Sequence, residues 1–166
     1  MAIDTGFKLK QLTRILKYNK KELAFIESLK PFNGDEWDGE LMRVSATAKQ
    51  KRDNIKIKIK KALQKIQGNN CVYCGWSFEI VGVSEREHIA PKGRYNSFVF
   101  EPYNLALACH YCNGSSKKGI ENTISKPDIK YKKCTFKIVH PYFHDINKHI
   151  FKDYDEKNQL KAKRVQ

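Results

Sequence analysis

The residues with the clearest capacity for chemistry are four cysteines in two identical pairs, Cys71-x-x-Cys74 and Cys109-x-x-Cys112. In a reducing compartment, paired cysteines at this spacing indicate a metal site rather than disulfides. Four thiolates in a tetrahedral arrangement favour Zn²⁺, and four protein ligands leave no open position for a substrate. We therefore expect a structural zinc ion, with an iron–sulfur or redox site as the alternative.

A second set of polar residues lies between and beside the cysteine pairs. Its members are Glu87-His88-Ile89-Ala90-Pro91-Lys92, Asn104-Leu105, and Asn113 directly after Cys112, with Lys117 four residues later. This order resembles the HNH endonuclease family, whose members commonly read Cys-x-x-Cys, acidic-His-x-x-Pro, Asn-Leu and Cys-x-x-Cys-Asn-x-x-x-Lys. The resemblance covers about residues 71–118. It implies a ββα-metal finger held together by the four-cysteine zinc site.

The resemblance implies a role for each of these polar residues. His88 matches the general base, since a neutral imidazole with an ordinary pKa near 6.5 can take a proton from water at neutral pH. Asn104 matches the asparagine that orients the histidine and braces the loop. Glu87 and Asn113 match the positions that hold a catalytic Mg²⁺ or Mn²⁺, whose charge stabilises the attacked phosphate.

The motif departs from the common family pattern at two positions. Glu87 replaces the commoner aspartate, and Asn113 stands where a histidine is often found. Both substitutions keep an oxygen or nitrogen ligand, so we still expect activity. Adjacent residues on a strand point to opposite faces, so Glu87 and His88 converge only where the strand twists or ends.

The sequence Glu-His-x-x-Pro-Lys at residues 87–92 looks like the HNH nucleases of bacterial anti-phage systems, notably the Septu type, which works beside an ATPase. This resemblance implies a defence or mobile-element context. It also implies an ATPase or another regulatory protein as a partner.

The distribution of charge indicates a polyanionic partner. The chain carries a formal charge of +14. Residues 1–68 hold 16 Lys/Arg and 8 Asp/Glu, residues 69–119 hold 5 and 4, and residues 120–166 hold 11 and 6. Basic flanks suit nucleic-acid phosphates, with DNA as the expected substrate and RNA as an alternative; a solvated lysine-rich surface is the plainer interpretation. Candidate phosphate contacts are Lys92, Arg94 and Lys117.

A non-catalytic zinc-finger module that binds nucleic acid or a partner protein is the competing hypothesis. Such a module would need the cysteines and the basic surface, but not His88, Asn104 or Asn113. The presence of all three at family-like positions favours the nuclease.

The remaining aromatic, histidine and cysteine residues are expected to have structural roles. The aromatic residues of the loop after Pro91 could stack on bases, but we expect them in the core; they are Tyr95, Phe98, Phe100 and Tyr103. Pro141 argues against a shared helix face for His140 and His144, so these and His149 are expected to be structural or on the surface. Cys134 is expected to be a free buried thiol.

The elements that must position the site follow from hydrophobic periodicity. Helical spacing is expected over residues 9–29 and over about residues 47–66, although Ile55-Lys-Ile57-Lys-Ile59 also alternates like a strand. Strands are expected over 77–83, in a short run ending at 87–89, over 104–108 and over 131–139, with a helix over 110–118. Glycines and prolines mark the breaks between them.

Together these features predict an α+β protein built on a ββα-metal finger. The expected organisation is a basic helical region at 1–68, the zinc-stapled core at 69–119 and a basic extension at 120–166. No apolar run reaches the roughly 18 residues that span a bilayer, so no membrane association and a cytoplasmic location are expected.

Overall fold

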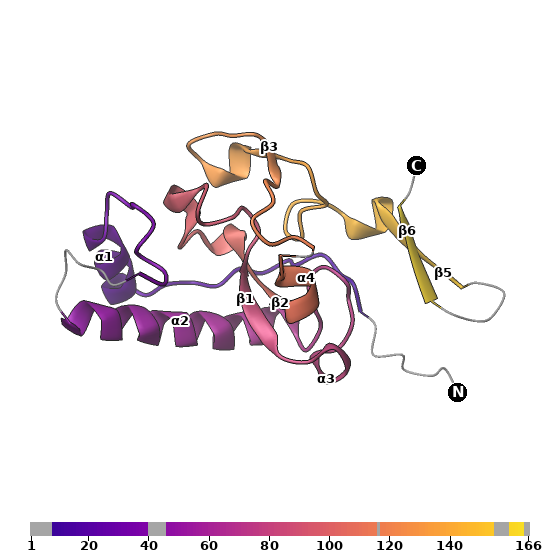
Figure 1. Ribbon diagram of the computed structural model, residues 1–166, viewed down its shortest axis with the longest axis horizontal. Helices are drawn as coiled ribbons and strands as arrows, with labels where there is room; N and C mark the ends of the chain where they lie inside the picture. The colour runs from indigo at the N-terminus through magenta and orange to yellow at the C-terminus, as the bar shows by residue number, and fades with distance from the viewer. Residues whose placement is uncertain (1–7, 40–45, 116, 155–159, 165–166) are drawn as a thin grey trace.

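The chain is a mixed α+β protein with small antiparallel sheets (Figure 1). A computed structural model describes residues 8–39, 46–115, 117–154 and 160–164. Its helices are α1 (Lys20–Ser28), α2 (Ala46–Gln67), α3 (Phe78–Val81) and α4 (His110–Asn113). Its strands are β1 (Ser84–His88), β2 (Leu105–Cys109), β3 (Ile124–Lys126), β4 (Thr135–Phe136), β5 (Ile150–Tyr154) and β6 (Leu160–Arg164).

The centre of the molecule is the antiparallel pair β1–β2, followed directly by α4 (Figure 1). The register places Glu87 opposite Ala106 and His88 opposite Leu105. Every residue of β2 is buried because the two faces of the strand meet different layers. Leu105 and Leu107 join the cluster under α2, whereas Ala106 and Ala108 join the cluster around the cysteine pairs, as alternation along a strand requires.

Helix α2 confirms the prediction of a helix over about residues 47–66 and excludes the alternating strand. Ile55, Ile59 and Leu63 recur every four residues and are buried in the cluster that contains Leu105 and Leu107. The helix ends at Gln67, whose side-chain amide donates to the carbonyl of Leu107 and accepts from its backbone N–H. Gln67 therefore ties the end of the helix to the edge of β2.

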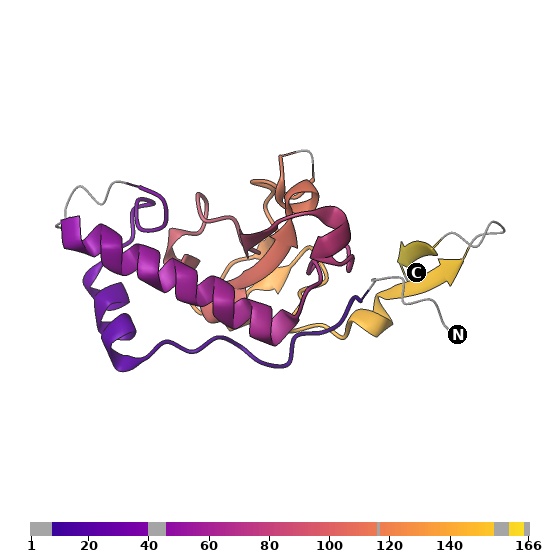
Figure 2. The same cartoon turned by 90° about the horizontal axis from the view of Figure 1, so that it is seen from below.

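Of the helical spacing expected over residues 9–29, the later part is confirmed by α1 and the first part is wrong. Residues 8–19 run instead as an extended segment beside α2 (Figure 2). Lys8 donates its backbone N–H to the carbonyl of Gly75, and Leu12 donates to that of Pro141. Leu12 and Leu16 are buried in two different clusters. Packing against distant segments therefore outweighs the local helical spacing of the leucines.

Three other expected elements are corrected. Residues 78–81 form α3 rather than a strand, because the Ser77 hydroxyl caps the helix by accepting from the backbone N–H of Glu79. The helix expected over 110–118 ends at Asn113 and is followed by Gly114. The strand expected over 131–139 is reduced to β4, preceded by a 3₁₀ turn at Tyr131–Lys133.

A third cluster lies over the loop between β1 and β2, and it explains the aromatic residues of that loop. Phe98 and Phe100 are buried, Tyr95 and Tyr103 are half-buried, and the four pack into the hydrophobic clusters as expected. His140 is fully buried, stacks on Phe143 and shares a hydrogen bond with the Tyr131 hydroxyl. Cys134 is a buried free thiol, also as expected.

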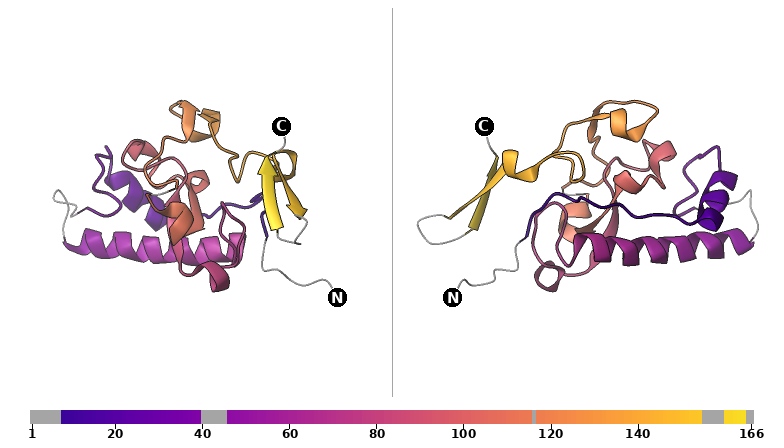
Figure 3. Two further views of the ribbon diagram at one scale, coloured as in Figure 1. Left: turned by 45° about the vertical axis from the view of Figure 1, so that its right-hand side comes forward. Right: turned by 180° about the vertical axis from the view of Figure 1, so that it is seen from behind.

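The hairpin of β5 and β6 lies at the end of the molecule far from α1 (Figure 3). Across the described residues, no helix is both long enough and apolar enough to cross a lipid bilayer.

Candidate metal centre and active-site cavity

The four paired cysteines come together as the sequence predicts. The Sγ atoms of Cys71, Cys74, Cys109 and Cys112 lie within 4.8 Å of one another, and those of Cys74 and Cys109 are 4.0 Å apart. A tetrahedral site with Zn–S bonds of about 2.3 Å separates its sulfurs by about 3.8 Å, close to the 4.0 Å between Cys74 and Cys109. The cluster can therefore hold a metal ion, as expected for a structural zinc.

Backbone contacts position the sulfurs. The N–H of Gly75 donates to the carbonyl of Cys71 and closes the first turn, where Gly75 has a φ of 74°. The N–H of Cys109 donates to Sγ of Cys71 at 3.3 Å. Hydrogen bonds from the thiols of Cys112 and Cys74 lower the pKa of the Cys71 thiol, whereas the contact with Cys71 raises the pKa of the Cys112 thiol. The centre joins the loop before α3 to the junction of β2 and α4.

A cavity of about 580 Å³ opens beside the end of β1. Four residues predicted for the site line it, namely Glu87, His88, Lys92 and Asn113. Further lining residues that bear on its chemistry are Trp37, Asp38, Glu85 and Lys118. Because β1 ends at His88, the adjacent Glu87 and His88 reach one cavity although they belong to opposite strand faces.

His88 is held as a neutral imidazole. Its side chain is buried, and burial lowers its pKa to about 3. The carbonyl of Val99 lies 3.0 Å from Nε2, so Nε2 carries the proton and donates to it. Nδ1 then keeps a free lone pair, and no described residue donates a hydrogen bond to it. The ring of Trp37 meets the imidazole edge-on at a centroid distance of 4.4 Å.

Glu87 is buried against a cation. Its Oε1 lies 2.6 Å from Nζ of Lys118 and accepts a hydrogen bond of 2.8 Å from the Tyr73 hydroxyl. Burial raises the pKa of Glu87, and the interactions with Lys118 and Tyr73 only partly oppose the increase. Lys118 also donates to the backbone carbonyl of His88 at 2.5 Å. The lysine therefore links the two central residues of the predicted motif.

Glu85 is a site residue that the sequence analysis missed. Its carboxylate accepts from Nδ2 of Asn113 at 2.8 Å and contacts Nδ1 of His110 at 2.7 Å. Partial burial raises its pKa, but the hydrogen bonds from Asn113 and His110 outweigh burial and hold the pKa below its ordinary value. Glu85 lies two residues before Glu87, and this period of two along a strand could have revealed it.

Asn104 lies in the core beside the cavity rather than on its wall. It is fully buried, and its Nδ2 donates to the carbonyls of Ala90 and Phe98. Its Oδ1 accepts from the N–H of Ala90 and from the Tyr131 hydroxyl. These four bonds fasten the loop between β1 and β2, including the segment that presents the Val99 carbonyl to His88.

The three predicted phosphate contacts lie in different surroundings. Lys92 reaches the cavity and forms an ion pair with Asp38. Lys117 is exposed, with its ammonium 5.1 Å from the centroid of the Tyr111 ring, and it lines a neighbouring cavity instead. Arg94 is exposed and lines none of the described cavities.

The segment before α2 supplies part of the cavity wall, which no motif indicated. Lys56 and Lys92 both bind the carboxylate of Asp38, and these hydrogen bonds outweigh partial burial and lower its pKa to about 2. The ring of Trp37 is buried between His88 and Phe100 and has the ammonium of Lys56 5.3 Å from its centroid.

Comparison with known proteins gives a partial similarity. The chain is 39% identical over 72 residues to the Septu protein PtuB of Bacillus thuringiensis. The matched segment makes up 43% of this chain and 27% of that protein, so the chain matches about a quarter of the length of its relative. No family model matches the chain, and no solved structure gives a significant match.

Proposed function

We propose that this protein is a metal-dependent HNH-type endonuclease that hydrolyses DNA phosphodiester bonds. The observation that carries the proposal is the cavity that joins an anchored, neutral His88 to the carboxylates of Glu85 and Glu87 and to the amide of Asn113. A base and a set of oxygen ligands in one cavity are what hydrolysis of a phosphodiester needs.

The surroundings of His88 support its role as general base. Donation from Nε2 to the Val99 carbonyl fixes the tautomer that leaves Nδ1 as the acceptor. Burial lowers the pKa of His88 to about 3, so the imidazole is unprotonated throughout the neutral range but is a weak proton acceptor. A phosphate anion bound beside it would raise this pKa and make the ring a better base. His88 can then take a proton from a water molecule as that water attacks phosphorus. Trp37 restricts rotation of the ring, because the two rings meet edge-on.

The donor set of the cavity fits Mg²⁺ or Mn²⁺. Glu87 and Asn113 would hold the ion through oxygen atoms, which these cations prefer. Asn113 donates a hydrogen bond to Glu85 through Nδ2, so Oδ1 is the atom that would bind the ion. When bound, the ion would stabilise negative charge on the phosphate and on the leaving oxygen. Glu85 would keep the Asn113 amide in place and add negative charge beside it.

The charges around the cavity support a nucleic-acid substrate. Basic side chains that line it are Lys60, Arg86, Lys92 and Lys118. Contacts from such groups to phosphates carry little sequence information, so we propose low intrinsic specificity for sequence. RNA is a second substrate class for the same chemistry, and Lys92, Arg94 and Lys117 remain proposed phosphate contacts.

We propose a role in bacterial defence, supported by the similarity to the Septu protein PtuB. The Septu resemblance also supports a protein partner, an ATPase or another regulator, that restrains cleavage until it is needed. Co-purification with an ATPase encoded by a neighbouring gene would test this part of the proposal.

A non-catalytic binding module is the second candidate, and two observations favour it. Lys118 already neutralises Glu87, the proposed metal ligand. In addition, among the described residues only the four cysteines bring three or more acidic, histidine or cysteine ligand atoms within 4.8 Å of one another. A module of this kind would bind nucleic acid without breaking it.

Cleavage and binding assays on the same zinc-loaded protein separate the two candidates. Supercoiled plasmid, single-stranded DNA and RNA are incubated with the protein and Mg²⁺ or Mn²⁺, and binding is measured with Ca²⁺ in their place. The nuclease proposal predicts nicked or linear plasmid that depends on the divalent ion. Binding of DNA without any cleavage in either ion would establish the binding module instead.

A further inference from the structure

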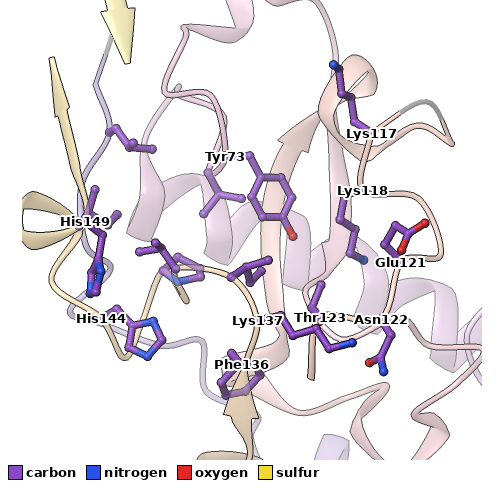
Figure 4. Close-up of a pocket in the computed structure, with 16 residues that line it drawn as sticks. Tyr73, Lys117, Lys118, Glu121, Asn122, Thr123, Phe136, Lys137, His144 and His149 are labelled. Carbon is purple, nitrogen blue, oxygen red and sulfur yellow. The ribbon is translucent and has the colours of Figure 1, made fainter. Parts of the chain in front are cut away.

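A second cavity, of about 720 Å³, adjoins the active-site cavity across Lys118 (Figure 4). Lys118 lines both cavities, and Tyr73 lines the second one while its hydroxyl donates to Glu87 beside the first. Figure 4 shows Tyr73 in the middle of this second cavity, with Lys117, Lys118 and Asn122 on one side and His144 and His149 on the other. We call this cavity the flanking groove.

The two cavities differ in their numbers of acidic and basic lining residues. The active-site cavity has four basic residues, given above, and three acidic ones, Asp38, Glu85 and Glu87. The flanking groove has three lysines, Lys117, Lys118 and Lys137, against a single glutamate, Glu121. Carboxylates suited to a metal are therefore concentrated in the first cavity. Because Lys118 is paired with Glu87, the flanking groove is left with Lys117 and Lys137 against Glu121.

The walls of the flanking groove combine this charge with apolar surface. Tyr73 and Phe136 present rings, and aliphatic side chains complete the wall; they are Leu9, Val72, Ile138, Val139 and Ile146. Lysines at the rim of a groove with an aromatic floor are the combination that binds single-stranded nucleic acid, with phosphates at the rim and bases on the floor. A volume of about 720 Å³ also lies within the range of sites that enclose small ligands.

We propose that the flanking groove binds unpaired nucleotides next to the phosphate that is cut. This inference rests on the proposed nuclease function and extends it by assigning a substrate form, a strand that is single-stranded beside the cleavage point. Lys118 lines both cavities, and Lys137, which is exposed in the flanking groove beside Thr123, contacts a phosphate of the flanking nucleotides.

Binding of labelled oligonucleotides to charge-reversed variants tests the proposal. Lys137→Glu is compared with Lys133→Glu, an exposed lysine four residues away that lines none of the described cavities. Both changes alter the net charge equally, so long-range attraction falls equally. We expect Lys137→Glu to weaken binding of single-stranded DNA by about tenfold and to reduce the salt slope of the affinity by about one, with little change for Lys133→Glu.

Each outcome decides a separate question. Equal effects of the two substitutions, or no effect of either, would overturn the flanking groove as a strand site. A fluorescent nucleoside triphosphate that binds in a Lys137-dependent manner, while the strand does not, would overturn it in favour of a free nucleotide. Lys137-dependent strand binding in a protein that never cleaves would support the groove and reject hydrolysis, whereas cleavage with binding indifferent to Lys137 would reject the groove alone.

Discussion

Nζ of Lys118 lies 2.6 Å from Oε1 of Glu87, with 11% of the lysine side chain and 3% of the glutamate side chain exposed. This pair connects the turn after α4 to the penultimate residue of β1. A buried ion pair adds little net stability as a pair, but removal of one partner leaves an uncompensated buried charge. Lys118 therefore compensates the buried charge of Glu87. It also donates a hydrogen bond to the backbone carbonyl of His88.

Lys118→Met should lower the free energy of unfolding by about 3 kcal/mol at pH 7.5, because it leaves Glu87 buried without a cation. Glu87 has a raised pKa in the folded protein, so its protonated form favours folding and this contribution is lost as pH rises through that pKa. Loss of Lys118 raises the pKa of Glu87 further, so the difference in unfolding free energy between the variant and the unchanged protein should grow with pH. Denaturant unfolding at several pH values with zinc present measures it.

The adjacent exposed lysine supplies the control for that experiment. Lys117→Met removes the same charge from the next residue and should change the free energy of unfolding by less than about 0.5 kcal/mol. Equal losses for the two substitutions, at every pH, would mean that the buried pair has no special role. Lys118→Met combined with Glu87→Gln should recover much of the loss.

Cleavage should show no pH inflection near 6.5, the ordinary pKa of histidine, because the pKa of His88 is lowered to about 3. A depressed histidine pKa contributes stability that is present above 6.5 and is lost as the pH falls from 6.5 toward 3. His88 is therefore already deprotonated well below neutral pH. A profile of kcat/KM against pH, with zinc content measured at each point, checks this, and an acid limb near 6.5 would contradict it.

Removal of one cysteine of the candidate metal centre should unfold the region around it. Cys109→Ser takes away a sulfur that joins β2 and α4 to the first cysteine pair, so we expect loss of bound zinc and unfolding of the region around residues 71–113. Elemental analysis should give one zinc per chain for the unchanged protein and for Cys134→Ser, whose thiol lies outside the cluster. Full zinc retention by Cys109→Ser would exclude the proposed ligand set.

Asn104→Ala should cost at least about 3 kcal/mol of unfolding free energy, because it leaves several buried backbone groups without partners. Exposed Asn147→Ala serves as the comparison and should stay within about 0.5 kcal/mol. Activity should fall as well, since the loop that carries Val99 loosens and His88 loses its anchor. Unchanged stability of Asn104→Ala would refute its bracing role.

The part of the fold that contains the motif could be predicted because residues close together in the sequence determine it. The spacing of the cysteine pairs identified the metal centre, and β2 and α2 followed from apolar runs and helical periodicity. Glu85 could also have been found, because residues two apart share one face of a strand. The helix expected over residues 110–118 begins as predicted at His110 but ends at Asn113, before Gly114.

The rest of the site depends on contacts between distant segments. Trp37 lies 51 positions before His88, and no local pattern indicates that the two rings meet. Leu12 and Leu16 fit a helix by spacing, yet they are buried in an extended segment because other parts of the chain offer it backbone partners. The sequence motif also pointed to Lys117, whereas the structure turns Lys118 toward Glu87 and leaves Lys117 exposed.

Metal-dependent cleavage by zinc-loaded His88→Ala and His88→Gln proteins tests directly whether His88 is the general base. Glutamine can still donate to the Val99 carbonyl but cannot act as a base, so it separates positioning from proton transfer. We predict that both variants keep their zinc and lose about 10²–10⁴-fold in the rate of Mg²⁺- or Mn²⁺-dependent DNA cleavage. Cleavage by either variant at the rate of the unchanged protein would contradict the account.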